Sequence, residues 1–327
     1  LLLASSLAAS AQTAASGPGP APGVAPAAAL ASLQAGALDG SIRLDGRFDE
    51  PAWQQAPVIG NLTMSEPTPG AAPAGRTTVR VLAGRTAVVI GVRCDDPDAA
   101  GIVSFTKARD ASLQHEDHVK IVLDTFRDGR SGYVFAVNPG GARYDALVSP
   151  GGESEDANWD GLWEAATSRD AAGWSAEIRI PVSTLAFGKG LAAWNFNVER
   201  RVQRLQEIDR WAGWSRDYKV TQTSHAGELG GLPDFDLGVG LTVRPAVTTG
   251  GGIPAPGAEI DASLQPSLDV TQRLGSNLLG SVTVNTDFAE TEVDTRRTNL
   301  TRFPLFFPEK RTFFLEGADI FAFGLGL

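Results

Sequence analysis

Two neighbouring stretches decide the fold: Val79-Arg80-Val81-Leu82-Ala83 and Ala87-Val88-Val89-Ile90-Gly91-Val92-Arg93. Both are short, apolar and rich in β-branched side chains, as expected of strands that are buried in a sheet. Between them lies Gly84-Arg85, which predicts a hairpin-like turn because glycine adopts the backbone angles that tight turns need. The two stretches are therefore expected to pair as a β-hairpin.

The same kind of pattern recurs between residue 38 and residue 234. Further strands are expected at residues 118–124, 133–137, 142–148, 163–167, 173–181 and 193–200. Strands at intervals of roughly 10 to 15 residues, with little helical periodicity, predict an all-β domain that is an antiparallel sandwich or a barrel. Single helical turns are expected at residues 49–53, with an acidic start and Pro51 at the first helical position, and at residues 182–185.

The composition of the 327-residue chain excludes some classes of protein. Its net charge of −10 gives no electrostatic support for nucleic-acid binding, which needs a basic surface. The single cysteine, Cys94, excludes an intrachain disulfide and is interpreted as a buried strand residue. The seven tryptophans are large and costly to expose, so each is expected in the core or on a binding surface.

The first residues are typical of a targeting segment. Residues 1–11 combine an apolar run with Ala9-Ser10-Ala11, a small-residue cleavage pattern, and are interpreted as the remnant of a signal peptide. Because no initiator Met or basic segment precedes the run, the sequence is expected to begin inside the signal. Residues 12–37 are rich in Ala, Pro and Gly and are expected to form a flexible or extended linker. The protein is therefore predicted to be exported.

The pattern changes near residue 235. Apolar residues alternate with small or polar residues from Leu237 to Val243, from Leu264 to Val270 and from Leu278 to Val284, which is typical of transmembrane barrel strands. Only three or four such strands fit into residues 235–327, whereas a closed membrane barrel needs at least about eight. Either this interpretation is wrong or the segment is the N-terminal part of a longer barrel, and we expect the second.

Two resemblances to known families follow from local motifs. The segment Leu44-Asp45-Gly46-Arg47-Phe48-Asp49-Glu50-Pro51-Ala52-Trp53 resembles the opening of the family 9 carbohydrate-binding module, and further blocks extend the resemblance over residues 38–234. It implies a jelly-roll-like β-sandwich that binds a saccharide. Trp53, Trp174 and Trp194 lie in regular patterns and are expected in its core.

The second resemblance covers residues 285–323. The motifs Asn285-Thr286-Asp287-Phe288 and Phe306-Phe307-Pro308-Glu309-Lys310 are similar to bacterial proteins with domain of unknown function 5916, which carry a family-9-like domain before an outer-membrane barrel. This resemblance implies a location in the periplasm or the outer membrane of a Gram-negative bacterium. The expected domains are thus a carbohydrate-binding sandwich at 38–234 and an incomplete barrel at 235–327.

Three tryptophans in loop-like sequence are candidates for the sugar site. A pyranose packs its apolar face on a flat aromatic ring, while nearby polar side chains bind its hydroxyl groups. Family 9 modules clamp a sugar between two tryptophans. The resemblance implies a clamp of Trp159 with Trp211 or Trp214, assisted by Arg200, Glu207 and Arg210. The alternative is that these rings plug one end of the sandwich under its loops.

The acidic turn at residues 95–98 is a candidate calcium site. Carboxylate oxygens are the ligands that Ca²⁺ takes in proteins, and family 9 modules include calcium binders, so Asp95, Asp96 and Asp98 could chelate the ion. The other interpretation is a solvated acidic turn. The segment His115-Glu116-Asp117-His118 leads into a strand, where positions three apart face opposite ways, so no metal site is expected there.

Signatures of enzymes are absent from the sequence. It contains no Gly-x-Ser-x-Gly elbow, no Walker loop and no dinucleotide-binding glycine motif. Family 9 domains accompany glycosidases, so an enzyme here would be a hydrolase of O-glycosyl bonds, although no carboxylate pair stands out. The favoured function is glycan capture or carbohydrate catabolism by an exported module attached to an outer-membrane barrel. The alternative is a scaffold or plug of a transport or secretion barrel that binds no sugar.

Overall fold

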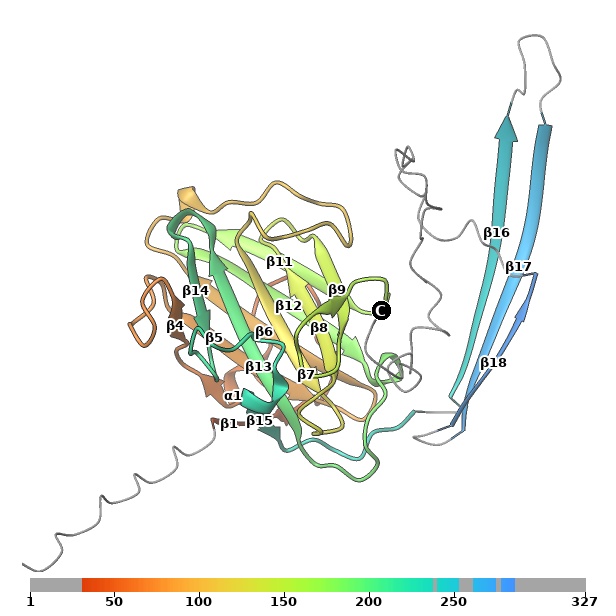
Figure 1. The fold of residues 1–327 in the computed structure, drawn as a ribbon. Helices are drawn as coiled ribbons and strands as arrows, with labels where there is room; N and C mark the ends of the chain where they lie inside the picture. Colours follow the sequence, from red (N-terminus) through yellow and green to blue (C-terminus); the bar gives the residue numbers. More distant parts are fainter. Residues whose placement is uncertain (1–30, 238–239, 253–260, 275–277, 286–327) are drawn as a thin grey trace, which may run out of the picture. The chain divides into compact units, whose positions relative to one another are not determined.

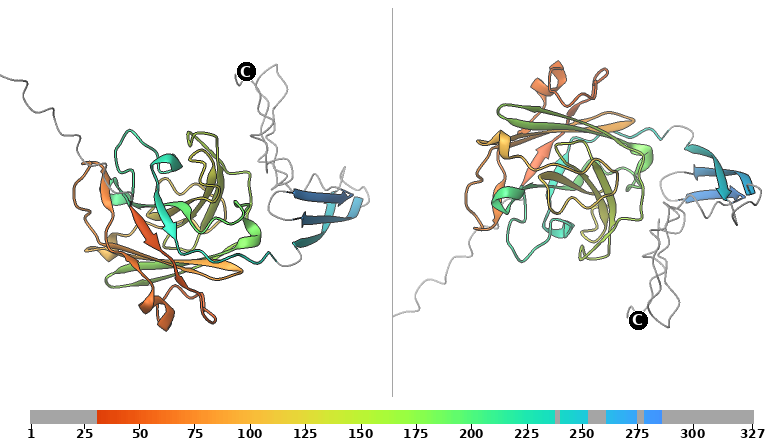
Figure 2. Two further views of the ribbon diagram at one scale, coloured as in Figure 1. Left: turned by 90° about the horizontal axis from the view of Figure 1, so that it is seen from below. Right: turned by 90° about the horizontal axis from the view of Figure 1, so that it is seen from above.

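The protein is described by a computed structural model that covers residues 31–237, 240–252, 261–274 and 278–285. Residues 31–237 form two β-sheets that lie face to face (Figures 1 and 2). The predicted all-β sandwich is confirmed. The predicted membrane strands form a separate three-stranded sheet, whereas the signal segment and the motifs at 286–323 lie outside the described residues.

The larger sheet has nine strands. Its main order is β1-β15-β13-β7-β8-β9-β10, with β14 pairing β13 and β4 pairing β14. The strands are β1 (Ser32–Gln34), β4 (Thr63–Glu66), β7 (His118–Asp124), β8 (Gly132–Val137), β9 (Arg143–Val148), β10 (Glu155–Asp156), β13 (Trp194–Val202), β14 (Glu207–Arg210) and β15 (Gly227–Gly230).

The smaller sheet has six strands in the order β11-β12-β6-β5-β2, with β3 also pairing β5. These are β2 (Gly36–Ala37), β3 (Val58–Ile59), β5 (Thr77–Ala83), β6 (Ala87–Asp95), β11 (Glu164–Asp170) and β12 (Gly173–Pro181). The hairpin expected from residues 79–93 is β5 and β6, paired antiparallel with Val81 opposite Ile90. Cys94 is buried in β6, where burial raises the pKa of its thiol to about 11.

The main core lies between the two sheets, because every second side chain of each strand points inward. Val79, Val81 and Ile90 of the smaller sheet meet Ile121 and Phe135 of the larger one. Burial of such side chains stabilises the fold by about 1.5–3 kcal/mol each. Trp174 and Trp194 belong to this core, as predicted from their regular patterns.

The motif at residues 44–53 covers the outer face of the smaller sheet. Helix α1 (Pro51–Gln55) lies on that face (Figure 2), and its Trp53 is fully buried against Leu82 and Val89. Pro51 opens the helix as expected, but the predicted acidic start does not act as a cap. Glu50 makes no side-chain cap bond to the helix and instead accepts a hydrogen bond from Arg43 N at 3.0 Å.

Two strands correct the predicted linker at residues 12–37. β1 pairs parallel with β15, and β2 pairs parallel with β5, so residues 32–37 join both sheets of the sandwich. The composition of this segment suggested an extended linker because its small residues carry little apolar pattern. The backbone of such residues still completes a sheet edge, and Leu33 adds a buried side chain to the core.

The last three described strands are β16 (Leu241–Gly252), β17 (Asp261–Leu274) and β18 (Leu278–Val284), which form an antiparallel sheet. In the register, Val243 lies opposite Val270, and Val270 lies opposite Val282. These strands alternate as predicted from sequence. Among the described residues, none of the helices has the length and apolar character to cross a membrane.

Candidate functional site

A cavity of about 640 Å³ lies over the outer face of the nine-stranded sheet. Its floor is formed by side chains of β7, β8, β9, β13 and β14, and its walls come from loops that are far apart in the sequence. The wall segments lie within residues 110–114, 153–157 and 219–221. The volume falls in the range of about 300–1,000 Å³ that is usual for small-molecule sites.

The floor is a single polar row that crosses the sheet. Arg210 is in register with Glu199, Glu199 with Lys120, Lys120 with Ala136 and Ala136 with Tyr144. Because side chains alternate between faces, strands held in this register place all five side chains on the outer face. All five line the cavity.

The Tyr144 end of the row is held by Glu155 of β10. Glu155 accepts hydrogen bonds from Lys120 Nζ at 2.7 Å and from Tyr144 Oη at 3.0 Å. The small side chain of Ala136 lies between Lys120 and Tyr144 in the register, so it leaves room for both long side chains to meet Glu155. Burial, followed by the charge of Glu155, raises the pKa of the Tyr144 hydroxyl, which stays protonated, gives its hydrogen to Glu155 and leaves its oxygen as an acceptor.

The other end of the row is held by an ion pair between β13 and β14. Arg210 Nε donates to Glu199 Oε2 at 2.6 Å, and both side chains are almost fully buried. Arg210 Nη1 also donates to the carbonyl oxygens of Ser215 and Tyr218. The guanidinium therefore ties the floor of the cavity to the loop at residues 211–218.

His118 lines the same cavity as a neutral imidazole. Its Nδ1 lies 3.0 Å from the carbonyl oxygen of Glu116, so this nitrogen carries the proton and Nε2 is an acceptor. Burial, followed by the charge of Lys120, lowers the pKa of His118 to about 4. The imidazole is therefore uncharged at neutral pH.

The charges around the cavity balance one another closely. Each lining cation has a carboxylate partner, because Lys120 binds Glu155, Arg210 binds Glu199, and Lys219 Nζ lies 3.0 Å from Glu153 at the rim. Such pairs hold donors and acceptors in fixed positions without presenting one sign of charge. The arrangement suits a neutral ligand with many hydroxyl groups better than a strongly charged one.

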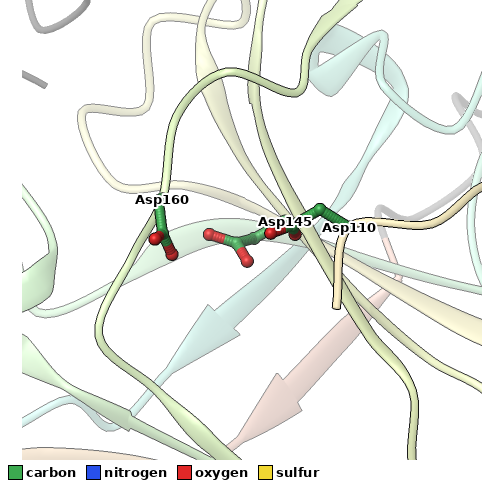
Figure 3. Close-up of side chains that lie close together, drawn as sticks. All are labelled: Asp110, Asp145 and Asp160. Atoms are coloured by element: carbon green, nitrogen blue, oxygen red, sulfur yellow. The ribbon is translucent and has the colours of Figure 1, made fainter. Parts of the chain in front are cut away.

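Three aspartates gather beside this cavity around one arginine. Figure 3 shows the carboxyl groups of Asp110, Asp145 and Asp160 close together, and their oxygens lie within 4.8 Å of one another. Arg109 Nη2 donates to both Asp145 and Asp160, and Arg109 Nε donates to Asp110. The guanidinium thus takes the position at which a cation would bind, and the cluster is a structural junction between strand β9, which carries Asp145, and the loops that carry Asp110 and Asp160.

Asp110 belongs to both this junction and the cavity wall. Burial, followed by the charge of Asp145, raises its pKa to about 6, and Arg109 opposes that rise. Its carboxylate is thus expected to take up a proton in mildly acidic solution.

The structure separates the residues that the sequence suggested as one sugar clamp. Trp159 is 2% exposed, and its ring packs against Tyr133 and Phe135 in the core. It belongs to the main core between the sheets, and the close approach of Gly161 to its ring covers it further. Trp211 is partly buried against Phe196.

Trp214 differs from the other two candidates because 42% of its surface is exposed. A methyl group placed on Gly70 would lie 3.4 Å from its ring, so this glycine lets the ring lie close to the backbone of a neighbouring loop. Trp214 also precedes Ser215, whose carbonyl oxygen accepts from Arg210. Of the three tryptophans, Trp214 alone presents a large free aromatic surface.

Arg200 and Glu207 point into the molecule rather than to the cavity. Arg200 is 2% exposed, and its guanidinium donates to Thr77 Oγ1 and to the carbonyl oxygens of Gly75 and Asp95. Glu207 is 3% exposed and accepts from Ala74 N. The alternation of β13 and β14 puts these two residues on the inner face, whereas Arg210 is on the outer face. Only Arg210 of the six predicted sugar-site residues lines the cavity.

The proposed calcium ligands are engaged by arginines. Asp96 accepts from both terminal nitrogens of Arg204, at 2.6 and 2.7 Å, and Asp95 accepts from Arg93 Nε at 2.8 Å. Asp98 instead caps a short turn by accepting from Gly101 N. Among the described residues, Asp95, Asp96 and Asp98 do not gather around one point. The arrangement of these carboxylates does not fit a calcium site. The turn at residues 95–98 is instead held by ion pairs with arginines.

Sequence reasoning missed most of the cavity. Lys120, Tyr144 and Glu199 lie in strands that gave no functional signal, since each is an ordinary outward-facing polar residue. The signal that could have found them is the pairing register, which aligns Lys120 with Glu199 on β13 and Ala136 with Tyr144 on β9.

The fold and the cavity define a class of protein: a two-sheet β-sandwich with a polar, ligand-sized cavity on the outer face of one sheet. Residues 258–325 match the family model for domain of unknown function DUF5916, as the motifs predicted. The sequence matches none of the curated proteins with which it was compared.

Solved structures with a similar fold cover 61% of this chain. A candidate carbohydrate-binding protein from Bacteroides uniformis is 12% identical, with 98% of that chain covered and a TM-score of 0.50. A carbohydrate binding module of family 9 from Caldicellulosiruptor kristjanssonii, solved in complex with cellotriose, is 16% identical, with 93% of that chain covered and a TM-score of 0.46. At this level of identity, the Bacteroides uniformis likeness shows a shared fold.

Proposed function

We propose that this protein binds carbohydrate in the cavity on the outer face of the nine-stranded sheet. The observation that carries the proposal is the polar row Arg210, Glu199, Lys120 and Tyr144, in register across four strands and completed by Glu155. Support also comes from the Bacteroides uniformis structure of similar fold, which is described as a candidate carbohydrate-binding protein.

The chemistry of the row matches that of a sugar. Each hydroxyl group of a saccharide both donates and accepts a hydrogen bond, so it is best bound by donors and acceptors placed side by side. Ion-paired side chains offer this combination, and their partners already fix their geometry, which lowers the entropic cost of binding. Lys120 retains ammonium hydrogens beyond the one given to Glu155, and His118 Nε2 adds a neutral acceptor.

Trp214 is the side chain that we propose as the stacking platform. Its exposed ring stands on the loop that Arg210 holds against the cavity floor. Because Trp214 lies beside Gly70 and does not itself line the cavity, its ring would pack on a ligand that extends beyond the polar row, such as an oligosaccharide. Trp159, which the sequence suggested as the second ring of the clamp, is buried in the core and is not exposed to a ligand. In the proposed site, the polar row on the cavity floor binds the sugar in its place.

A proposal about location rests on the three-stranded sheet. In register across β16, β17 and β18, one face carries Val243, Val247, Leu264, Leu268 and Val282, each between 37% and 69% exposed. A continuous apolar face opposite a polar face is expected of strands that lie against lipid. We propose that this sheet belongs to an outer-membrane barrel and that the sandwich is an exported module in glycan capture.

Titration of the chain with neutral mono- and oligosaccharides tests the sugar proposal. We expect calorimetric binding together with a change in tryptophan fluorescence. Lys120→Met and Tyr144→Phe should weaken binding about tenfold or more, because each removes hydrogen bonds worth about 1.5 kcal/mol. Trp214→Ala should weaken it similarly, whereas Glu164→Gln, an exposed change on β11, should not.

The alternative function predicts a different result. A scaffold or plug that binds no sugar would show neither heat nor a fluorescence change with any saccharide at millimolar concentration. That result would refute the carbohydrate proposal. A hydrolase is not proposed, because the cavity-lining carboxylates Glu153, Glu155 and Glu199 are each engaged in an ion pair with a lysine or an arginine, whereas glycoside cleavage needs two carboxyl groups that face the substrate.

A further inference from the structure

A second polar cluster lies on the opposite, inner face of β14. Glu207 and Asp209 are two residues apart on this strand, so both point inward. They are 3% and 0% exposed, respectively. Two carboxyl groups buried side by side need either cations or hydrogen-bond donors, because an isolated buried carboxylate is very unfavourable.

The donors near Asp209 are all committed elsewhere. Neither carboxyl oxygen of Asp209 has a hydrogen-bond donor as a partner. Arg200 lies opposite Asp209 in the register, but its guanidinium points to Thr77 and to the carbonyl oxygens of Gly75 and Asp95. Arg200 also faces Asp96, at 3.7 Å, so its charge is shared with another buried carboxylate.

The edge strand β4 adds a second unpartnered group. The β4–β14 pairing is irregular between Ile208 and Asp209, and Ser65 is the residue left over at that point. Its hydroxyl is fully buried and lacks a hydrogen-bond partner. The paired strands β4 and β14 thus contain buried side-chain oxygens, on Ser65 and Asp209, that have no hydrogen-bond partner.

We propose that Glu207 and Asp209 hold one proton between them, and that this proton keeps the β4–β14 edge and the following loop closed. The charged groups that act on Asp209 are Glu207 on its own strand and Arg200 and Glu199 on β13. Two of these three are carboxylates, so an ionised Asp209 would add a like charge to a site that is buried from solvent.

The acid–base behaviour of Asp209 follows from this environment. Burial, followed by the charge of Glu207, raises its pKa to about 8. In an open edge, Asp209 would titrate near the ordinary value of about 4. The closed edge therefore binds one more proton than the open edge between pH 4 and pH 8, and its stability falls as pH rises through that window and levels off above pH 8.

The buried cluster is linked to the cavity because Asp209 is the immediate sequence neighbour of Arg210, which lines the cavity. Arg210 follows Asp209 and holds both Glu199 on the cavity floor and Tyr218 in the wall loop. Opening of the edge at alkaline pH would release this arginine. Loss of ligand affinity as pH rises toward 8 is then expected, and this last step alone rests on the proposed sugar-binding function.

Hydrogen–deuterium exchange of the full chain between pH 5 and pH 9 tests the proposal. After correction for intrinsic exchange rates, protection of residues 63–66 and 207–218 should fall by up to about tenfold per pH unit below pH 8. Asp209→Asn imitates the protonated side chain and should remove this dependence. The matched control Glu66→Gln, on β4 of the same edge, should keep it.

The proposal is overturned if protection of these residues does not change with pH, or if Asp209→Asn responds as the unmodified chain does. Should the variant fail to fold, ¹³C NMR of the Asp209 carboxyl group in the unmodified chain decides the matter. A titration midpoint above pH 6.5 supports the shared proton, and a lower midpoint overturns it. Neither measurement depends on whether a sugar binds.

Discussion

At the scale of single residues, Glu177 explains why the motif at residues 44–53 combines an Asp-Gly turn with a tryptophan. This buried carboxylate on β12 accepts hydrogen bonds from Trp53 Nε1, Asp45 N and Gly46 N, at 3.0, 2.9 and 2.9 Å. Gly46 is required because its φ is +80° and an added Cβ would lie 2.5 Å from the backbone of Thr167. The motif is therefore a structural anchor of the smaller sheet rather than part of the ligand site.

Glu177→Gln should destabilise the sandwich by about 3 kcal/mol, because the amide group turns a donor toward donors that then lack an acceptor. The free energy of unfolding measured with denaturant checks this expectation. Glu164→Gln, an exposed change on the neighbouring strand β11, should cost less than about 0.5 kcal/mol. Equal effects of the two substitutions would show that the anchor contributes little.

At the scale of elements, pairing register turns ordinary strands into functional surfaces. A shift of one residue would turn Lys120 and Glu199 inward and place Val119 and Val198 on the cavity floor. The inward packing of Ile121, Phe135 and Phe196 prevents such a shift, since it would expose the core. The polar row is thus fixed by the apolar residues on the other face of the same strands.

Register also defines the apolar face of β16–β18. If this face lies against lipid, Val282→Lys should destabilise insertion by about 2–4 kcal/mol near the middle of the bilayer. Thr283→Lys, one residue away on the polar face, should be tolerated. Recovery of the chain in the outer-membrane fraction of a Gram-negative host measures the difference, and equal recovery of both variants would count against contact with lipid.

At the scale of the whole molecule, the cavity depends on the complete sandwich. Its walls come from residues 110–114, 153–157 and 219–221, and its floor needs β14 to pair with β13 and β13 to pair with β7. Unfolding of any of these parts removes the site. A ligand that binds there therefore binds the folded state alone.

Ligand binding should stabilise the protein by mass action. A saccharide at one hundred times its Kd should raise the free energy of unfolding by about 2.7 kcal/mol. The shift of the denaturant midpoint with ligand concentration measures this effect. Lys120→Met, which disrupts the polar row, should show a much smaller shift at the same concentration, and equal shifts would place the ligand outside the cavity.

The sequence by itself determined the longer strands of the sandwich (β5–β9 and β11–β13), the β5–β6 hairpin, the buried Cys94 and the core positions of Trp53, Trp174 and Trp194, whereas it missed the short strands β1–β4, β10, β14 and β15. These features are local, because alternation and turn residues act over a few positions. The tertiary structure decided which faces of β13 and β14 look outward, and so it separated Arg210 from Arg200 and Glu207. It also sealed Trp159 and left Trp214 exposed, since loop paths depend on packing between segments that are far apart in the chain.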